Sequence, residues 1–459
     1  MAASNKPNFK KMSWQVASCS LMSMAGFSVI QSYGAYIFTD LAGIPYTTTS
    51  MCMFIISILG AIVCIFAGAQ VQHTKTKFGQ YRPWIMAGYL VILLGGALMF
   101  TKFQSPVLTI VVVSIGYALP NLILNYTGTA EYGLLLNMSS GDSDARGLLF
   151  SRYWAGANAC TMIVGIILVP LITFFSFAGE RQGYLLTHVL FGVLAVIGGM
   201  RFANYGKKYD GDNRRSASVV EEEKASLGDM VKSVVVNRPA AMVVLADIFR
   251  FTGFYVMYTL MAYQCQYVIG DMMALSYYLT ASSVAAVLGN LLAPMAIEKI
   301  GGRKKAAIIF NILTGFGWLL ICLLGRTTWG FVAAGAIAYF FMSFQDSIDQ
   351  AMYGDAGEYY LHKTGKDTRA FLLSMYSLAV KIGIALSSLA LGIVLGLINY
   401  EPGMTMTAHS SNLLTIATGL TPAICYFVPV ILLLIHGVSD KEIAVCIKEN
   451  AEKYGTEEE

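Results

Sequence analysis

About twelve long apolar segments follow one another along this chain, separated by short polar turns. Each is close to the roughly 20 apolar residues that an α-helix needs to cross a bilayer. Hydrophobic residues make up 56% of the chain and charged residues only 13%, whereas soluble proteins carry about 25% charged residues. So few charges cannot cover a water-exposed surface. The sequence therefore predicts an all-α membrane protein with 12 transmembrane helices.

One longer polar segment divides the predicted helices into two sets of six. We expect an N-terminal six-helix half at 1–204, a cytoplasmic linker with a surface helix at 205–238, a C-terminal six-helix half at 239–437 and a cytoplasmic tail at 438–459. The basic turn HTKTKFGQYRPW follows the second span, and the basic turn EKIGGRKKAA follows the eighth. The halves therefore look like internal repeats, an arrangement that places substrate near the membrane midplane.

The distribution of basic residues predicts the orientation. An even number of spans puts both termini on one side. Of the 31 Lys and Arg residues, only Lys102, Arg181 and Arg326 fall in turns on the other side. Cytoplasmic loops carry an excess of Lys and Arg. We therefore expect both termini to be cytoplasmic in a multi-pass protein of a bacterial-type inner (cell) membrane.

Several classes of function are not indicated. The sequence shows no Walker loop, no H-E-x-x-H motif and no ordered Ser/His/Asp set, so neither an enzyme nor ATP use is expected. The 8 cysteines are scattered without a C-x-x-C pair, which favours small buried side chains over disulfides or metal ligands. No basic block suggests nucleic acid as a partner.

Charged residues inside apolar segments are costly and are functional candidates by default. The richest stretch runs from Asp346 to Lys381. Asp346 and Asp349 are three residues apart and share one helix face, and Lys381 in the next span is a plausible cationic partner. These residues either couple transport to a cation or form a structural charge pair that locks two helices together.

Two other places carry charge inside predicted spans. Asp247 and Arg250 are three residues apart in the seventh span, so they form either an internal ion pair or a contact with substrate. Glu131, with Tyr126 nearby, lies in the fourth span. A buried carboxyl group of this kind suits proton coupling or substrate binding.

Four motifs, in order along the chain, are shared with one transporter family. They are FTDLAGIP at the end of the first span, FGQYRPWIMAG after the second, NRPAA at the start of the seventh, and GDAGEYYLHKTGKDTR followed by SLAVK. On these motifs the chain resembles the glycoside–pentoside–hexuronide:cation symporters, which include the melibiose and glucuronide carriers. That family is a branch of the major facilitator superfamily, so the resemblance implies its twelve-helix fold.

The resemblance also implies roles for individual residues. Arg152 and Lys381 match the family's fifth-span arginine and eleventh-span lysine. Arg152 is therefore a candidate for substrate binding, unless it is an interfacial arginine that extends to the membrane surface. Trp154 beside it either stacks on a sugar ring or belongs to an interfacial aromatic belt. The full set of substrate candidates is Arg152, Glu131, Tyr126, Trp154, Asp247, Arg250 and Lys381.

The chain departs from the family where a cation would bind. The resemblance implies two aspartates one helical turn apart in the second span, but those places hold Gly60 and Cys64. Neither side chain supplies an oxygen ligand, so a proton is favoured over sodium. A proton-coupled carrier needs only one titratable group in a place that alternates in exposure. The coupling candidates are Asp346, Asp349, Glu131 and Lys381.

Charged residues also gather in the predicted cytoplasmic turns. They are interpreted either as a salt-bridged cytoplasmic gate that breaks when the carrier opens inward, or as basic residues that only set the topology. The gate candidates are Arg82, Arg303, Asp355, Glu358, Lys363 and Arg369.

Together these features predict a secondary active transporter that moves a glycoside, pentoside or hexuronide by alternating access. The alternatives are an uncoupled facilitator or exchanger for a less polar or anionic small organic solute, and a sensor that binds solute without moving it. No cofactor is expected apart from a coupling cation, H+ or Na+, and no structural metal. The expected partners are the solute and the lipid bilayer, with the protein as a monomer.

Overall fold

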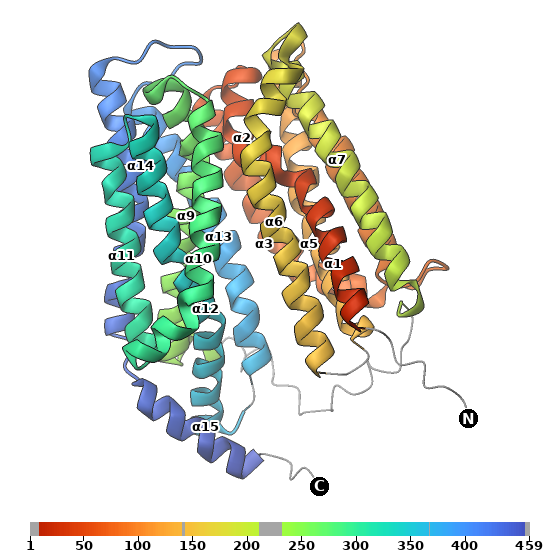
Figure 1. Ribbon diagram of the computed structural model, residues 1–459, viewed down its shortest axis with the longest axis vertical. Helices are drawn as coiled ribbons and strands as arrows, with labels where there is room; N and C mark the ends of the chain where they lie inside the picture. Colours follow the sequence, from red (N-terminus) through yellow and green to blue (C-terminus); the bar gives the residue numbers. More distant parts are fainter. Residues whose placement is uncertain (1–8, 140–142, 211–231, 367, 455–459) are drawn as a thin grey trace. The chain divides into compact units, whose positions relative to one another are not determined.

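The computed structural model describes residues 9–139, 143–210, 232–366 and 368–454 (Figure 1). These residues are helical or lie in short turns, and no named strand occurs among them. The prediction of an all-α protein is therefore confirmed. Most of the surface helix predicted in the linker lies outside the described residues.

The described residues form two compact units. The first comprises residues 9–139 and 143–210 with two short later segments, Leu275–Thr280 and Tyr400–Met404. Its helices are α1 (Phe9–Met24), η1 (Ala25–Phe27), α2 (Ser28–Tyr36), η2 (Ile37–Leu41), α3 (Tyr46–His73), α4 (Arg82–Leu98), α5 (Pro106–Met138), α6 (Ser143–Phe175), η3 (Ser176–Ala178), α7 (Glu180–Tyr205) and η4 (Gly206–Lys208).

The second unit contains most of the remaining described residues. Its helices are α9 (Arg238–Tyr263), η6 (Gln264–Ile269), α10 (Met273–Ile300), α11 (Arg303–Leu324), α12 (Thr328–Thr364), α13 (Arg369–Leu397), α14 (Ala408–Leu434) and α15 (Asp440–Tyr454). The last of these, α15, lies within the predicted tail.

Local signals explain where several helices begin and end. The Ser105 side chain accepts a hydrogen bond from the Leu108 backbone N–H at the start of α5, and Pro106 follows it. Thr327 accepts a bond from the Gly330 N–H in the same way before α12. Such caps satisfy N–H groups that have no partner within the helix. α12 ends at Gly365, whose φ of 71° is readily available only to glycine.

Each unit is held together by packed helix pairs. In the first unit α4 packs on α5 and α7, and α1 packs on α6 and α7. In the second, α11 packs on α12 and α14, and α9 packs on α13 and α14 (Figure 1). Small residues allow close approach: a Cβ added at Gly253 on α9 would lie 2.8 Å from Cβ of Cys425 on α14.

Nine helices in the described part of the chain are long and apolar enough to cross a membrane. The other three predicted spans correspond to the continuous stretch α1–η2, to α4, which is shorter, and to α12, which carries the most charged candidates. The number of 12 spans and the cytoplasmic position of the termini remain predictions.

The basic turn before α4 and the basic turn before α11 have one feature in common. In each case, an aspartate binds the start of the helix that follows the turn. Asp210, after α7, accepts bonds from the N–H groups of Gln80 (2.8 Å), Tyr81 (3.1 Å) and Arg82 (3.0 Å) at the start of α4. Asp440, after α14, accepts a 3.1 Å bond from the Lys304 N–H at the start of α11. A carboxylate there also interacts favourably with the helix dipole.

Candidate functional site

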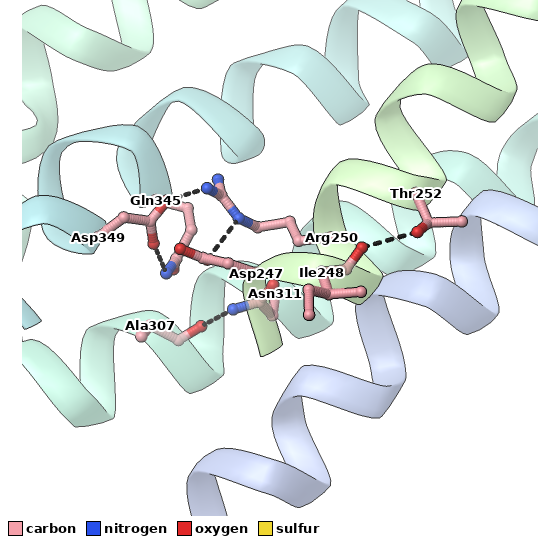
Figure 2. Close-up of polar contacts among 8 residues, drawn as sticks. All are labelled: Asp247, Ile248, Arg250, Thr252, Ala307, Asn311, Gln345 and Asp349. Atoms are coloured by element: carbon pink, nitrogen blue, oxygen red, sulfur yellow. Dashed lines mark hydrogen bonds and ion pairs between the residues drawn. The ribbon is translucent and has the colours of Figure 1, made fainter. Parts of the chain in front are cut away.

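Three charged side chains, Asp247, Arg250 and Asp349, meet inside the second unit, and we call them the Arg250 triad (Figure 2). The Arg250 Nε lies 3.3 Å from the Asp247 Oδ1 on the same face of α9. A terminal nitrogen of the same guanidinium forms an ion pair with the Asp349 Oδ2 on α12. All three residues are almost completely buried. One arginine therefore bridges two carboxylates and joins two helices.

Two amide side chains surround this triad. The Gln345 Nε2 donates a 2.5 Å bond to the Asp349 Oδ1 from one turn earlier on α12. The Asn311 Nδ2 on α11 donates a 2.8 Å bond to the Ala307 carbonyl oxygen (Figure 2). Among the described residues, the carbonyl oxygens of both amides have no hydrogen-bond partner. Two unsatisfied acceptors thus remain beside the buried charges.

These groups line a small cavity of about 10 Å³. A cavity needs roughly 10–15 Å³ to hold one water molecule, and the water needs two to four polar partners. Asp247, Asn311 and Gln345 all line this cavity. It therefore has the size and the polar lining to hold a single water between the triad and the amide oxygens.

The triad carries one net negative charge when all three of its groups are ionised. Burying an uncompensated charge is costly, and a buried ion pair is favourable only when its remaining polar atoms are satisfied. A single proton on either carboxyl group would make the triad neutral.

A second buried carboxyl group lies in the first unit. Glu131 on α5 accepts a 2.7 Å bond from the Tyr89 hydroxyl on α4 and a 2.6 Å bond from the Tyr153 hydroxyl on α6. Glu131 is 2% exposed. We call these three residues the Glu131 site. Its two phenol donors offset part of the penalty for a buried charge.

The other substrate candidates have the following surroundings. The Arg152 guanidinium stands 4.2 Å from the ring centre of Trp14, a cation–π contact. Trp154 is 51% exposed. The Tyr126 hydroxyl donates a 2.8 Å bond to the Gln70 side chain, and its ring stacks on Trp84 at 4.7 Å. Lys381 is partly exposed on α13. These side chains remain predictions for substrate binding.

One pair of the gate candidates is joined in the structure. Arg303 at the start of α11 lies 2.7 and 3.0 Å from the two oxygens of Asp355 on α12. Both residues belong to the second unit. Arg82 donates 3.0 Å bonds to the carbonyl oxygens of Ala203 and Phe78.

Two further gate candidates make contacts that the structure describes. Glu358 accepts a 2.8 Å bond from the Asn450 amide of α15. The Lys363 ammonium lies 5.5 Å from the Tyr359 ring centre. The side chains of Asp346 and Arg369 lie outside those that the structure describes. The gate itself remains a prediction.

The model of one protein family, described as MFS/sugar transport protein, matches residues 17–439. The chain belongs to this family. The resemblance noted from the sequence is thereby confirmed, and the chain is a sugar-transporter-type member of the major facilitator superfamily. Because the family consists of membrane transporters, the protein is a transporter rather than an enzyme, and it spans the membrane several times.

Two relatives of this MFS/sugar transport protein are similar to it over most of its length. It is 24% identical over 438 residues to the uncharacterized symporter YjmB of Bacillus subtilis strain 168, covering 93% of this chain and 92% of that protein. It is 24% identical to the lactose permease of Lactobacillus delbrueckii subsp. bulgaricus, covering 79% of this chain and 59% of the permease.

The fold of this family member matches a crystal structure of the peptide transporter POT with a TM-score of 0.66. The match covers 95% of both chains at 12% sequence identity, so it shows the fold alone. The prediction of a major facilitator fold is therefore confirmed.

Sequence reasoning missed several residues of the two buried sites. Tyr89, Gln345 and Asn311 were not singled out. The spacing of Gln345 and Asp349 could have indicated their contact, because Gln345 precedes Asp349 by one helical turn. Tyr89 and Asn311 gave no such clue, because they lie on helices whose rotation and depth the sequence pattern does not determine. The pairing of Arg250 with Asp349 was also not predicted.

Proposed function

We propose that this MFS/sugar transport protein is a proton-coupled symporter of a glycoside, pentoside or hexuronide. It works by alternating access in the cell (inner) membrane, as a monomer with both termini in the cytoplasm. The observation that carries the proposal is the Arg250 triad, in which a buried arginine bridges two buried carboxylates.

Proton coupling follows from the charge balance of the triad. On their own, these three residues carry one net negative charge, so one proton neutralises them without a cage of ligands. Among the contacts of Asp349 are the ion pair with Arg250 and the hydrogen bond from Gln345. Protonation of Asp349 would remove its ion pair with Arg250 and leave the guanidinium beside Asp247. That exchange alters the link between α9 and α12, which is the kind of change that an alternating carrier requires.

Glu131 is the second coupling candidate. Its carboxyl group is buried and held by two hydroxyl donors from neighbouring helices. Either carboxyl group can hold the transported proton on its own. Asp349 is favoured because its partner is a cation, so that its ionisation decides whether an ion pair exists.

Sodium is disfavoured because Gly60 and Cys64 stand where the resembled family places two aspartates. No atom lies within 4 Å of a Cβ added at Gly60. A sodium ion needs several oxygen ligands around it, and these two side chains provide none.

Support for a sugar-type substrate comes from the family and from the similarity to a lactose permease. Arg152 and Trp154, both accessible on α6, are the residues we propose for contact with it. The guanidinium suits hydroxyl and carboxylate groups, and the indole suits a sugar ring. An arginine at this place also accommodates a hexuronide.

A second candidate is an uncoupled facilitator or exchanger for a less polar or anionic solute. The observation that favours it is the same arginine, because a built-in cation can neutralise a carboxylate without any ion from outside. In that case the triad stays ionised throughout the cycle and serves only to join two helices.

Uptake into proteoliposomes separates the candidates. Solute uptake is measured with a panel of glycosides and hexuronides under a proton gradient, then a sodium gradient, then neither. A proton-coupled symporter accumulates solute only under the proton gradient. Accumulation with sodium alone, or equilibration with no accumulation under any gradient, contradicts proton coupling.

Two variants assign the coupling group. Asp349→Asn should abolish accumulation but leave counterflow exchange intact, because exchange needs no net proton movement. Glu131→Gln should slow transport without abolishing accumulation. If the effects are reversed, the coupling proton is on Glu131 and the assignment to Asp349 is wrong.

A further inference from the structure

A pocket of about 390 Å³ lies at the predicted cytoplasmic end of the second unit. It is formed where α9 begins, where α12 ends and where the chain passes from α14 to α15. Its volume is within the range of small-molecule sites. Of the substrate and coupling candidates whose side chains the structure describes, none lines it. Of the gate candidates with described side chains, Lys363 alone does so.

The pocket is rich in positive charge. Arg238 at the start of α9 and Lys363 near the end of α12 both line it and are exposed. The start of α9 adds the positive end of a helix of 26 residues. Tyr359 and Thr364 contribute further polar groups to the lining. Two cationic side chains beside a helix start form a typical environment for an anion.

Two buried polar side chains in the lining each have one atom without a hydrogen-bond partner among the described residues. Asn237 is 4% exposed and His436 is 6% exposed. Within the described part of the chain, the Asn237 Oδ1 and the His436 Nδ1 have no hydrogen-bond partner. The Asn237 Nδ2 is held by the Ala356 carbonyl oxygen at 2.9 Å, which fixes the amide in place. Buried polar atoms without partners are uncommon.

Two cations and one carboxylate lie near His436. His436 lies beyond the last residue of α14. Burial, together with the cations Lys304 and Arg238, lowers the pKa of His436 to about 4, although Asp440 acts in the opposite direction. The surroundings of His436 therefore disfavour one more positive charge.

Apolar side chains flank this cationic pocket. Val235 and Val236, just before α9, are 71% and 72% exposed, and Val236 is part of the lining. Exposed apolar residues beside basic ones are typical of sites at the membrane surface.

We propose that this pocket binds a phosphate group, carried either by an anionic lipid headgroup or by a soluble phosphate compound. Arg238 and Lys363 contact the phosphate oxygens, and His436 Nδ1 donates to one of them when its proton is on that nitrogen. Asn237 Oδ1 accepts a hydrogen bond from a hydroxyl group of the same molecule, such as a hydroxyl of a glycerol headgroup. The site shares Lys363 with the predicted gate, but it does not depend on the substrate or coupling residues that we propose.

Binding to the purified, delipidated full-length protein in detergent tests the proposal. The probes are dioctanoyl phosphatidylglycerol, dioctanoyl phosphatidylcholine and inorganic phosphate, and native mass spectrometry counts the bound molecules. We expect one saturable site for phosphatidylglycerol, with weaker binding of phosphatidylcholine. If inorganic phosphate competes at similar concentrations, the phosphate alone is sufficient and a soluble compound is the source. If it does not compete, the lipid is the source.

Matched variants assign the binding to the pocket. Lys363→Gln and Arg238→Gln should each weaken binding about tenfold, as expected for the loss of one charge-assisted contact. Lys305→Gln removes the same charge from an exposed residue of α11 that does not line the pocket and should leave binding unchanged. The proposal is overturned if the wild-type protein shows no saturable site, or if all three variants bind alike.

Discussion

The guanidinium of Arg250 on α9 forms an ion pair with the carboxylate of Asp349 on α12, and both side chains are buried. Asp247 holds the same guanidinium from one turn earlier on α9. Removing the arginine would therefore leave two buried carboxylates without their cation, whereas removing one carboxylate leaves the arginine still paired. The three residues should respond very differently to substitution.

Arg250→Met should lower the free energy of unfolding by about 3–5 kcal/mol, because breaking a buried pair leaves uncompensated charge. Denaturant unfolding of the purified protein in detergent measures this. Adding Asp247→Asn and Asp349→Asn to the same chain should restore most of the loss. Arg152→Met is the control, since it removes a partly exposed cation–π contact and should cost about 0.5–1 kcal/mol. Equal losses for the two arginines would contradict the special position of Arg250.

Tyr153→Phe should cost about 1.5–3 kcal/mol of stability if Glu131 is ionised, because it removes a 2.6 Å hydrogen bond to a buried carboxyl group. Tyr89→Phe should have a similar effect through its 2.7 Å bond. Tyr132→Phe is the matched control, because it also removes one tyrosine hydroxyl. The ring centre of Tyr132 lies 5.8 Å from that of Tyr153. Thermal unfolding in detergent gives the comparison, and a loss for Tyr132→Phe as large as the others would count against the Glu131 site.

The helices of this protein could be predicted from hydropathy because a segment in lipid must satisfy its backbone hydrogen bonds within itself. The Asp247–Arg250 contact was also available from the sequence, since three-residue spacing places both on one face of α9. The Arg250–Asp349 pair was not, because it joins α9 to α12 and depends on how those helices are rotated. We expected Lys381 as the partner of Asp349, and a contact with Lys381 remains a prediction.

The first residues of the linker show a second limit of the sequence pattern. The segment that follows α7 is polar and rich in charge, which is typical of a flexible tether. Asp210 in that segment nevertheless binds three backbone N–H groups at the start of α4. A capping residue usually precedes its helix directly. This one comes from more than 100 positions away, so no local motif indicates it.

Asp210→Ala should lower the free energy of unfolding by about 1–2 kcal/mol through loss of this cap. Gly79→Ala should act in the same direction, since Gly79 has a φ of +106° and an added Cβ would meet the Asp210 carboxylate. Gly60→Ala is the control, because a Cβ at that place in α3 has no atom within 4 Å. Chemical denaturation in detergent ranks the three, and a Gly60→Ala loss equal to the Gly79→Ala loss would argue against the cap.

Arg303→Gln should change stability by only about 0–1 kcal/mol, since the Arg303 side chain is 48% exposed and exposed ion pairs contribute little. Its effect on transport is the test of a gate. If the Arg303–Asp355 pair opens and closes during the cycle, Arg303→Gln should change the uptake rate several-fold. The charge-swapped variant Arg303→Asp with Asp355→Arg should restore that rate. A normal uptake rate for the single variant would leave the pair without a gating role.

Stability should fall on acidification because of His436. Its folded-state pKa, about 4, lies below its ordinary value of 6.5, so the unfolded chain binds the proton more readily. The contribution is fully present above pH 6.5 and is lost as the pH falls toward 4. Between pH 7 and pH 5 the loss should be roughly 2 kcal/mol. Unfolding at both pH values checks this, and His436→Gln should reduce the difference by that amount; an unchanged difference would show that His436 does not titrate in this way.

Asp210 and Asp440 each follow the last long helix of one half and return to a turn of that same half. Each of the two units therefore contains such a fastening of its own. This decides where the polypeptide can be cut. A break or an inserted reporter placed after Asp210 leaves both fastenings intact, whereas one placed a few residues earlier separates α4 from its cap. Two fragments divided beyond Asp210 are consequently the ones to co-express when a split, functional carrier is wanted.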